Sequence, residues 1–97
     1  MANTRISTQI VEISHWLPII TFCPVNNLPD LLYVTVTFDH FKELYEVRRR
    51  IRQLIAFRKM YMEDVAESVF KLFNECVSVQ VRLVGSKHIV HITAAHN

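Results

Sequence analysis

The chain has 97 residues but only one glycine, three prolines and two cysteines. A single glycine excludes the glycine-rich loops that bind phosphate groups. It also excludes the G-x-S-x-G turn that carries the nucleophile of many hydrolases. Two cysteines are too few for the disulfide framework of a small secreted domain. The CxxC and HxxxH spacings of metal sites do not occur, so we predict no metal centre.

Long hydrophobic runs are also missing. No apolar segment approaches the roughly 18–20 residues that a helix needs to cross a bilayer. Residues 1–9 are polar, without the apolar segment behind a basic start that marks a signal peptide. We therefore expect a soluble, cytoplasmic protein that does not bind membranes, in a compartment where thiols stay reduced.

The length and the hydrophobic content together suggest an oligomer. Ninety-seven residues predict a single domain over residues 1–97, with residues 1–8 as a polar lead-in. A chain of this length buries only about 60–65% of its unfolded surface. Yet 51% of the residues are hydrophobic, slightly above the usual share of about 45–50%. The surplus favours burial against copies of the same chain, and we expect a homo-oligomer.

The first third of the chain predicts two strands around a long loop. Residues 9–13 alternate polar and apolar side chains, which suits a short strand. Residues 15–30 hold all three prolines, so we expect an ordered loop there. In residues 31–38, β-branched and aromatic side chains alternate, which predicts a second strand.

The rest of the chain predicts two helices and a hairpin. Apolar residues recur at helical spacing from Leu44 to Ile55, with acidic residues early and Arg58 and Lys59 late, as the helix dipole favours. A second apolar stripe runs from Val65 to Cys76. Residues 77–83 and 88–95 alternate as paired strands around a turn at 85–87. Two hairpins flanking a helix pair indicate an α+β fold.

Cys23 is the main candidate for a reactive group. It precedes a proline, and Asp30 follows another, so rigid backbone holds a thiol and a carboxylate in fixed relation. A cysteine attacks as its thiolate and needs a nearby group to take and return protons. The alternative is a small buried hydrophobe, which is our assignment for Cys76. Both interpretations of Cys23 stay open on spacing alone.

Basic residues are concentrated in one stretch, although the formal net charge is only +2. Arg48, Arg52 and Lys59 fall roughly on one side of the first predicted helix, with Arg49 adjacent. Such a run is either a solvated helix face or a surface that contacts the phosphates of a nucleic acid. The sequence favours neither interpretation.

A longer string resembles a known family. It begins one residue before Cys23 and reads Phe22-Cys23-Pro24-Val25-Asn26-Asn27-Leu28-Pro29-Asp30. This is similar to the C-P-V-x-x-x-P-D signature of the nitrile reductases that act on 7-cyano-7-deazaguanine. The lead-in Ile10-Val11-Glu12 also resembles that family. Phe57-Arg58 followed by Met62-Glu63-Asp64 resembles its F-R…H-E-D segment, with two fewer residues between.

The resemblance implies a fold and roles for individual residues. The implied fold is the tunnelling fold, a β-β-α-α-β-β unit whose copies form a ring, in this case a decamer, with substrate sites between subunits. The matching cysteine, Cys23, would attack the nitrile carbon to give a thioimide. Asp30 would handle the proton on the nitrile nitrogen, and Glu63 would bind the base. Protonation or hydrogen bonding of the nitrile nitrogen makes its carbon electrophilic.

Two departures from the reductases redirect the predicted activity. Their lysine-containing NADPH signature is replaced by Glu46-Val47-Arg48-Arg49-Arg50-Ile51, and their histidine before the substrate glutamate is Met62. A thioimide without a hydride donor needs another nucleophile, and ammonia would yield the amidine of archaeosine. The chain thus more closely resembles the reductase-like archaeosine synthases, which modify the base within tRNA without a cofactor. His91 or His96 would then replace the missing histidine, His96 as a substrate-binding residue.

Two alternatives stay open. The first is an NADPH-dependent reductase of the free base. The second is a non-catalytic RNA-binding module that kept the fold, although such a module has no need for Cys23 and Asp30 at this spacing. A metal site at His88 and His91 is disfavoured, because residues three apart on a strand point to opposite faces.

Overall fold

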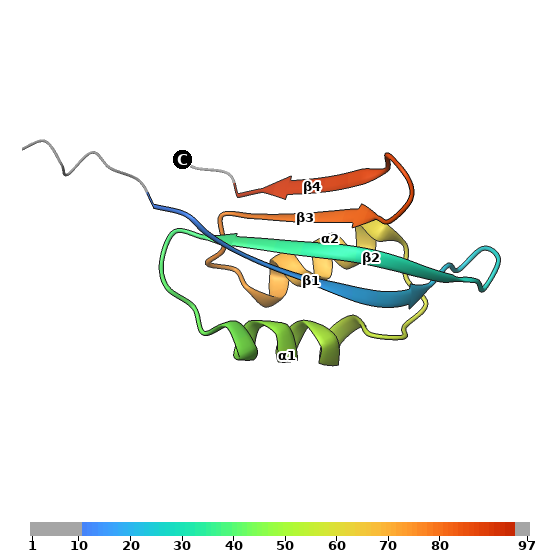
Figure 1. Ribbon diagram of the computed structural model, residues 1–97, viewed down its shortest axis with the longest axis horizontal. Helices are drawn as coiled ribbons and strands as arrows, with labels where there is room; N and C mark the ends of the chain where they lie inside the picture. Colours follow the sequence, from blue (N-terminus) through green and yellow to red (C-terminus); the bar gives the residue numbers. More distant parts are fainter. Residues whose placement is uncertain (1–10, 95–97) are drawn as a thin grey trace, which may run out of the picture.

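A computed structural model describes residues 11–94 of the chain (Figure 1). The elements follow the order strand, strand, helix, helix, strand, strand. They are β1 (Ile13–Phe22), β2 (Pro29–Phe38), α1 (Leu44–Ile55), α2 (Met62–Leu72), β3 (Ser78–Leu83) and β4 (Ile89–Thr93). The prediction of one domain over residues 1–97 includes the undescribed ends, where the predicted lead-in lies, and stays a prediction.

The strands form one antiparallel sheet in the order β1-β2-β3-β4. Both helices cover the same face, with α1 packed mainly on β1 and α2 on β3 and β4. The other face carries no helix within the described chain. This arrangement confirms the α+β class and the β-β-α-α-β-β order of the tunnelling-fold unit.

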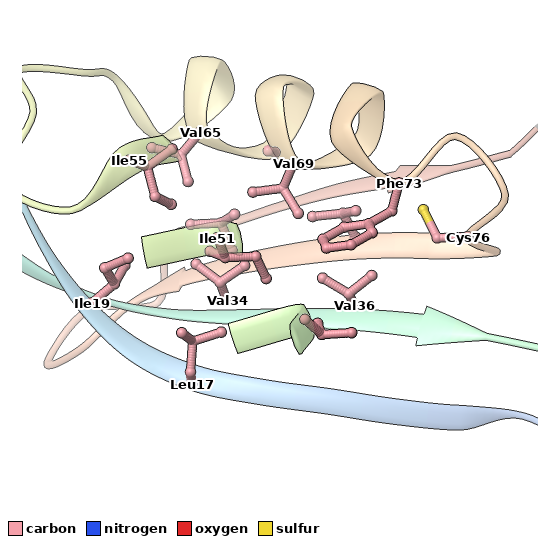
Figure 2. Close-up of a cluster of buried hydrophobic side chains, with 14 of the residues drawn as sticks. Leu17, Ile19, Val34, Val36, Ile51, Ile55, Val65, Val69, Phe73 and Cys76 are labelled. Atoms are coloured by element: carbon pink, nitrogen blue, oxygen red, sulfur yellow. The ribbon is translucent and has the colours of Figure 1, made fainter. Parts of the chain in front are cut away.

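The core lies between the sheet and the helices (Figure 2). Alternate strand residues point into it, and Leu17, Val34 and Val81 are fully buried. The helices contribute Ile51 and Val69, which are also fully buried. The apolar face formed by every second strand residue therefore packs against the apolar stripe of each helix in a single layer.

The predicted loop at 15–30 is wrong. Most of it is strand, because β1 runs to Phe22 and β2 begins at Pro29, leaving a turn of residues 23–28. The prolines are compatible with this. Pro18 lies in β1, an edge strand, and Pro29 is the first residue of β2, and both positions tolerate a missing N–H. Pro24 lies in the turn.

Other predicted boundaries shift as well. The short strand predicted at 9–13 is wrong for Val11 and Glu12, which precede β1, while residues 9 and 10 lie outside the described residues. Helix α1 ends at Ile55, before Arg58 and Lys59, because Phe57 adopts a positive φ of 62°. Helix α2 ends at Leu72, and Phe73 and Cys76 extend its buried stripe beyond the helix.

Neither helix of residues 11–94 combines the length and the apolar character needed to cross a bilayer.

One polar side chain in the core predicts a pH dependence of stability. His15 is 6% exposed, meets the Phe38 ring edge-on with 5.7 Å between centroids, and leaves Nε2 without a hydrogen-bond partner. Burial lowers the pKa of His15 below its usual 6.5, and the nearby Glu43 charge partly opposes this shift. The folded state therefore binds this proton less readily than the unfolded state.

The contribution of His15 to stability should be complete above pH 6.5 and should be lost as the pH falls through the lowered pKa of the folded protein. We expect the free energy of unfolding in urea to fall as the pH is lowered below 6.5. His15→Phe should flatten this slope. His91→Gln, at an exposed position, is the control and should leave the slope unchanged. Identical slopes in wild type and His15→Phe would contradict the prediction.

Candidate active site

Both hairpin turns and the α1–α2 connection meet at one end of the sheet (Figure 1). A cavity of about 340 Å³ lies between them. Its lining includes a thiol, two carboxylates and an imidazole, from Cys23, Asp30, Glu63 and His88, together with the phenol of Tyr61. Pro24, Met62 and Ser86 are among its other lining residues. The structure thus brings a thiol, two carboxylates and an imidazole from distant parts of the chain to one cavity.

The turn after β1 holds Cys23 in place. The Cys23 N–H donates to the Leu28 carbonyl at 2.9 Å, and the Asn27 N–H donates to the Cys23 carbonyl at 2.8 Å. Asn27 takes a positive φ of 62°, a conformation that asparagine tolerates better than most residues. The Asn26 side chain accepts a further bond from the Leu28 N–H at 3.0 Å. Both ends of the turn are therefore fixed, and the thiol is half-buried.

Asp30 reaches the cavity because of its place in the pleat. It pairs with Thr21 and alternates with Leu31, so it lies on the helix side of the sheet. Its side chain is half-buried. The seven-residue spacing from Cys23 is thus a turn plus two strand positions, and this returns the carboxylate to the cavity that the thiol lines.

Glu63 enters from the first turn of α2. The preceding segment is bonded to the end of β1: Phe57 N–H donates to Ile20, Phe22 N–H to Arg58, and Met60 N–H to Phe22, at 2.7, 2.9 and 3.1 Å. These bonds set where α2 begins. The first turn of α2 therefore borders the cavity, which Met62 and Glu63 line. The backbone N–H groups at this end of a helix favour negative charge.

His88 is the residue that the sequence did not single out for this site. Its carbonyl accepts from the Leu83 N–H at 3.2 Å, and its own N–H donates to Ser86 Oγ at 3.1 Å. These bonds shape the β3–β4 turn and place the ring on the cavity. No local signal in the sequence indicates this, because the two hairpin turns share one end of the sheet only through the antiparallel pairing of β2 with β3.

Two histidines, His91 and His96, were predicted to replace the family histidine that is Met62 in this chain, and the structure describes only the first of them. His91 pairs with Gln80 on the face away from the helices and does not line the cavity, so this expectation is wrong. Its place follows from strand alternation, which puts it opposite the inward-facing Ile92. His96 lies outside the described residues, and its role stays a prediction.

The predicted nucleic-acid residues lie partly together. Arg48, Arg49 and Arg52 line a shallow groove of about 420 Å³ on α1 with Tyr45 and Gln53. Lys59 is not part of it, because α1 ends before it and Lys59 instead bridges to Phe22 of β1. The predicted alignment of Lys59 with the arginines of the helix is therefore wrong.

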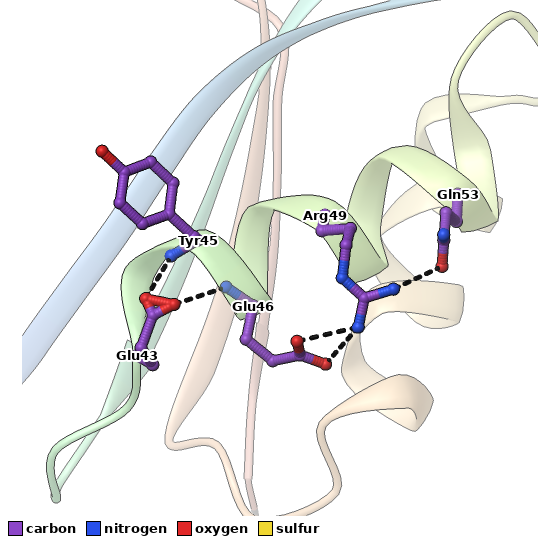
Figure 3. Close-up of polar contacts among 5 residues, drawn as sticks. All are labelled: Glu43, Tyr45, Glu46, Arg49 and Gln53. Atoms are coloured by element: carbon purple, nitrogen blue, oxygen red, sulfur yellow. Dashed lines mark hydrogen bonds and ion pairs between the residues drawn. The ribbon is translucent and has the colours of Figure 1, made fainter.

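The arginines of this groove differ in their polar contacts, and Figure 3 shows those of Arg49. Arg49 donates to both carboxylate oxygens of Glu46 at 2.7 Å and to Gln53 at 3.3 Å. The hydrogen bond from Arg49 lowers the pKa of Glu46, so this ion pair persists to lower pH. Arg48 and Arg52 have no ion pair within residues 11–94. They are the groove's uncompensated charges.

No group of three or more potential metal ligands occurs within the described residues.

The fold and the cavity define a small α+β domain with a cysteine, two carboxylates and a histidine at one end of its sheet. The solved structure of an archaeosine synthase QueF-Like, in the apo form, is similar to this chain. The TM-score is 0.64 at 16% sequence identity, over 84% of this chain and 90% of that one. No family model and no curated protein sequence matches the chain. The similarity establishes the shared fold.

The two cysteines should differ in reactivity. Cys76 is 3% exposed, and burial raises the pKa of its thiol. Cys23 is half-buried beside an open cavity. Iodoacetamide at about pH 8 should therefore add one carbamidomethyl group to the folded protein, measured by intact mass. Cys23→Ala should abolish this fast labelling, and Cys76→Ala should leave it unchanged. Equal labelling of both thiols would show that the cavity does not expose Cys23 selectively.

Proposed function

We propose that the protein is an amidinotransferase that converts 7-cyano-7-deazaguanine in tRNA to archaeosine, using ammonia and no redox cofactor. One observation carries the proposal: Cys23, Asp30 and Glu63, the residues matched to the family signature, line one cavity. They come from a turn, a strand and a helix, and nothing in the distance along the chain requires Glu63 to meet Cys23 and Asp30. The shared fold with an archaeosine synthase supports the same function.

The first step is addition of the Cys23 thiol to the nitrile. A bond forms between Sγ and the nitrile carbon, one carbon–nitrogen π bond breaks, and the nitrogen gains a proton. The product is a thioimide on Cys23. Asp30 is the group that passes the thiol proton to the nitrogen, since a carboxylate held beside a thiol can take the proton and return it.

The second step is attack by ammonia on the thioimide carbon. A carbon–nitrogen bond forms, the carbon–sulfur bond breaks, and the electron pair leaves with sulfur. The proton lost by the incoming nitrogen returns to Cys23, with His88 as the relay, because a neutral imidazole can accept it. Nitrile and ammonia thus combine to an amidine. The reaction needs no external reductant or oxidant.

Glu63 is the residue that orients the base. The pyrimidine edge of a deazaguanine presents N–H donors, and a carboxylate only accepts when ionised. A charge-assisted pair of this kind is roughly twice as strong as a neutral hydrogen bond. Because Glu63 and Cys23 line the same cavity, a base bound by Glu63 would lie within reach of the thiol.

The α1 groove is the surface we assign to the tRNA backbone. Arg48 and Arg52 have no ion pair within the described residues, Arg49 shares its charge with Glu46, and Tyr45 is 78% exposed beside them. Lys59 lies near the active-site cavity through its bridge to Phe22, and we assign it to phosphates close to the modified nucleotide. Such contacts position an RNA without reading its sequence.

We also propose that the chain assembles into a ring, with ten copies as the predicted number. The sheet has two edge strands, β1 and β4, and an unpaired edge is a template for pairing with another chain. Within the described residues, the segment 57–60 bonds only to the last part of the outer edge of β1. The rest of that edge has no backbone partner there and can pair with another copy of the chain. Sedimentation should give a mass of ten times 11.4 kDa.

The covalent step is testable with the free base. Incubation with 7-cyano-7-deazaguanine should give an adduct of one base per chain by intact mass, absent in Cys23→Ala and present in Cys76→Ala. Asp30→Asn should slow adduct formation by about 10²–10⁴-fold, the usual effect of losing a proton-transfer group. Asp64→Asn, in the same helical turn as Glu63 but outside the cavity, is the matched control.

Product analysis separates the alternatives. With tRNA that carries the nitrile base, ammonium should yield the amidine nucleoside by mass spectrometry, without NADPH. An aminomethyl product that requires NADPH would instead assign the protein as a reductase. RNA binding without any adduct on Cys23 would leave only the non-catalytic module and would overturn the proposal.

The tRNA surface predicts a specific pattern of salt dependence. Arg52→Gln should weaken tRNA binding and lower the slope of log affinity against log salt by about one, since one phosphate contact is lost. Glu46→Gln should strengthen binding, because it frees the charge of Arg49. Lys71→Gln, on α2 and paired with Glu67, is the charge-matched control. Equal effects of Arg52→Gln and Lys71→Gln in fluorescence polarisation would argue against this groove.

A further inference from the structure

The sheet face away from the helices carries a second concave surface. A hollow of about 400 Å³ spans β1, β2 and β3 and is lined by Trp16, Tyr33, Thr35, Gln80 and Arg82. The strand register places Trp16, Thr35 and Gln80 in one row across the sheet, and Tyr33 opposite Arg82 in the next. These side chains alternate with the core residues, so they point away from the active-site cavity and from α1.

The aromatic side chains of this hollow contact one another and Arg82. The rings of Trp16 and Tyr33 meet edge-on at 5.6 Å between centroids, and the Arg82 guanidinium lies 5.8 Å from the centre of the Tyr33 ring. Trp16 is 60% exposed, so a large part of the indole is free to contact a ligand. A tryptophan is costly to leave in water unless something covers it, since it presents a large apolar area.

The charge of this face selects the ligand. Its strand positions within the described chain hold no aspartate or glutamate, and Arg82 is their only permanently charged side chain. These positions are Ser14, Trp16, Pro18, Ile20, Phe22, Pro29, Leu31, Tyr33, Thr35, Thr37, Ser78, Gln80, Arg82, Ile89, His91 and Thr93. Strand positions with one cation and no carboxylate suit a ligand that joins a negative charge to a flat apolar ring.

We propose that this face is a stacking platform for an unpaired nucleotide of RNA, separate from the nitrile site. Four-stranded sheets with helices on one face use exposed aromatic side chains on the other to stack bases of single-stranded RNA. Here Trp16 and Tyr33 stack the base, and Arg82 pairs with its phosphate. Gln80 and Thr35 supply hydrogen bonds to the edge of the base. The site rests on the proposed RNA partner but not on the chemistry of Cys23.

The platform is independent of the other proposed RNA surface. The α1 groove contacts phosphates with arginines on the helix side, where a duplex backbone would lie. The hollow on the open face offers flat rings, which a paired and stacked base cannot reach. It therefore selects unpaired nucleotides, such as those of a loop or of a chain end.

Trp16 reports directly on this site because it is the only tryptophan of the chain. A ten-nucleotide oligoadenylate should quench its fluorescence in a saturable manner, and inorganic polyphosphate of similar charge should not. The Tyr33→Ala and Arg82→Gln variants should weaken the quenching affinity by about five- to a hundredfold, as the loss of a stacking or charge contact does. Lys71→Gln and Cys23→Ala should leave it unchanged, and Cys23→Ala separates this site from the proposed reaction.

A second readout keeps the test independent of the probe residue. With labelled oligoadenylate, Trp16→Phe should bind close to wild type, and Trp16→Ala should lose affinity. Thermal unfolding of each variant checks that the fold persists. Quenching by polyphosphate, or an unchanged affinity in Tyr33→Ala and Trp16→Ala, would overturn the platform. A fall in the sedimentation mass of Trp16→Ala without a loss of RNA affinity would show that a second copy of the chain covers this face instead.

Discussion

Three backbone hydrogen bonds between the end of β1 and residues 57–60 set the geometry on which the candidate site depends. They run along Ile20 and Phe22 and fix the connection between the helices against the sheet. Without them, α2 could slide along the core, because apolar packing is not directional. With them, the first turn of α2 lies beside the turn that carries Cys23. The site is therefore a consequence of backbone pairing more than of side-chain contacts.

The same bonds explain why a positive φ at Phe57 persists. A left-handed conformation costs an ordinary residue about 1 kcal/mol or more. It lets the chain leave α1 after Ile55 and turn so that the Phe57 N–H reaches Ile20 at 2.7 Å. The exposed side chain of Phe57 is a second consequence, since the ring follows the backbone outward. A glycine would relieve the strain but would loosen the connection, and the chain has its only glycine elsewhere.

Sequence patterns predicted the elements whose burial is periodic. The strand from 31 to 38 and the stripe of α1 were recovered, because one buried face imposes a clear period. The first hairpin was not recovered. Its prolines suggested a loop, yet Pro18 is tolerated at an edge and Pro29 at a strand start, and sequence does not say which strand will be the edge. The buried row of β1 runs over odd-numbered residues from His15 to Thr21, but it contains two polar residues and the exposed row contains Trp16 and Ile20, so the sequence shows no polar–apolar alternation there.

The sequence predicted three residues of the candidate site but not the fourth. The spacing of Cys23 and Asp30 indicated proximity, but it was the family signature that added Glu63. The sequence suggests His88 only as a candidate metal ligand, since nothing local in it indicates that the second hairpin turn closes beside the first. Its position depends on sheet order, which is a property of the whole chain. The placement of His91 on the opposite face follows from strand alternation, so the sequence already argued against it as a member of the cavity.

The distribution of charge and aromatic groups differs between the two faces of the sheet, and so do the functions that we propose for them. The helix side ends in a cavity with carboxylates, a thiol and an imidazole, which suits proton transfer on a small planar group. The open side has rings and one arginine but no carboxylate along its strands, which suits a nucleotide held without chemistry. A carboxylate on the open face would repel a phosphate, and a bare aromatic face in the cavity would give no group to move protons. Strand alternation keeps the two environments apart by one residue, so a single thin sheet can present both to the same RNA or to different parts of it.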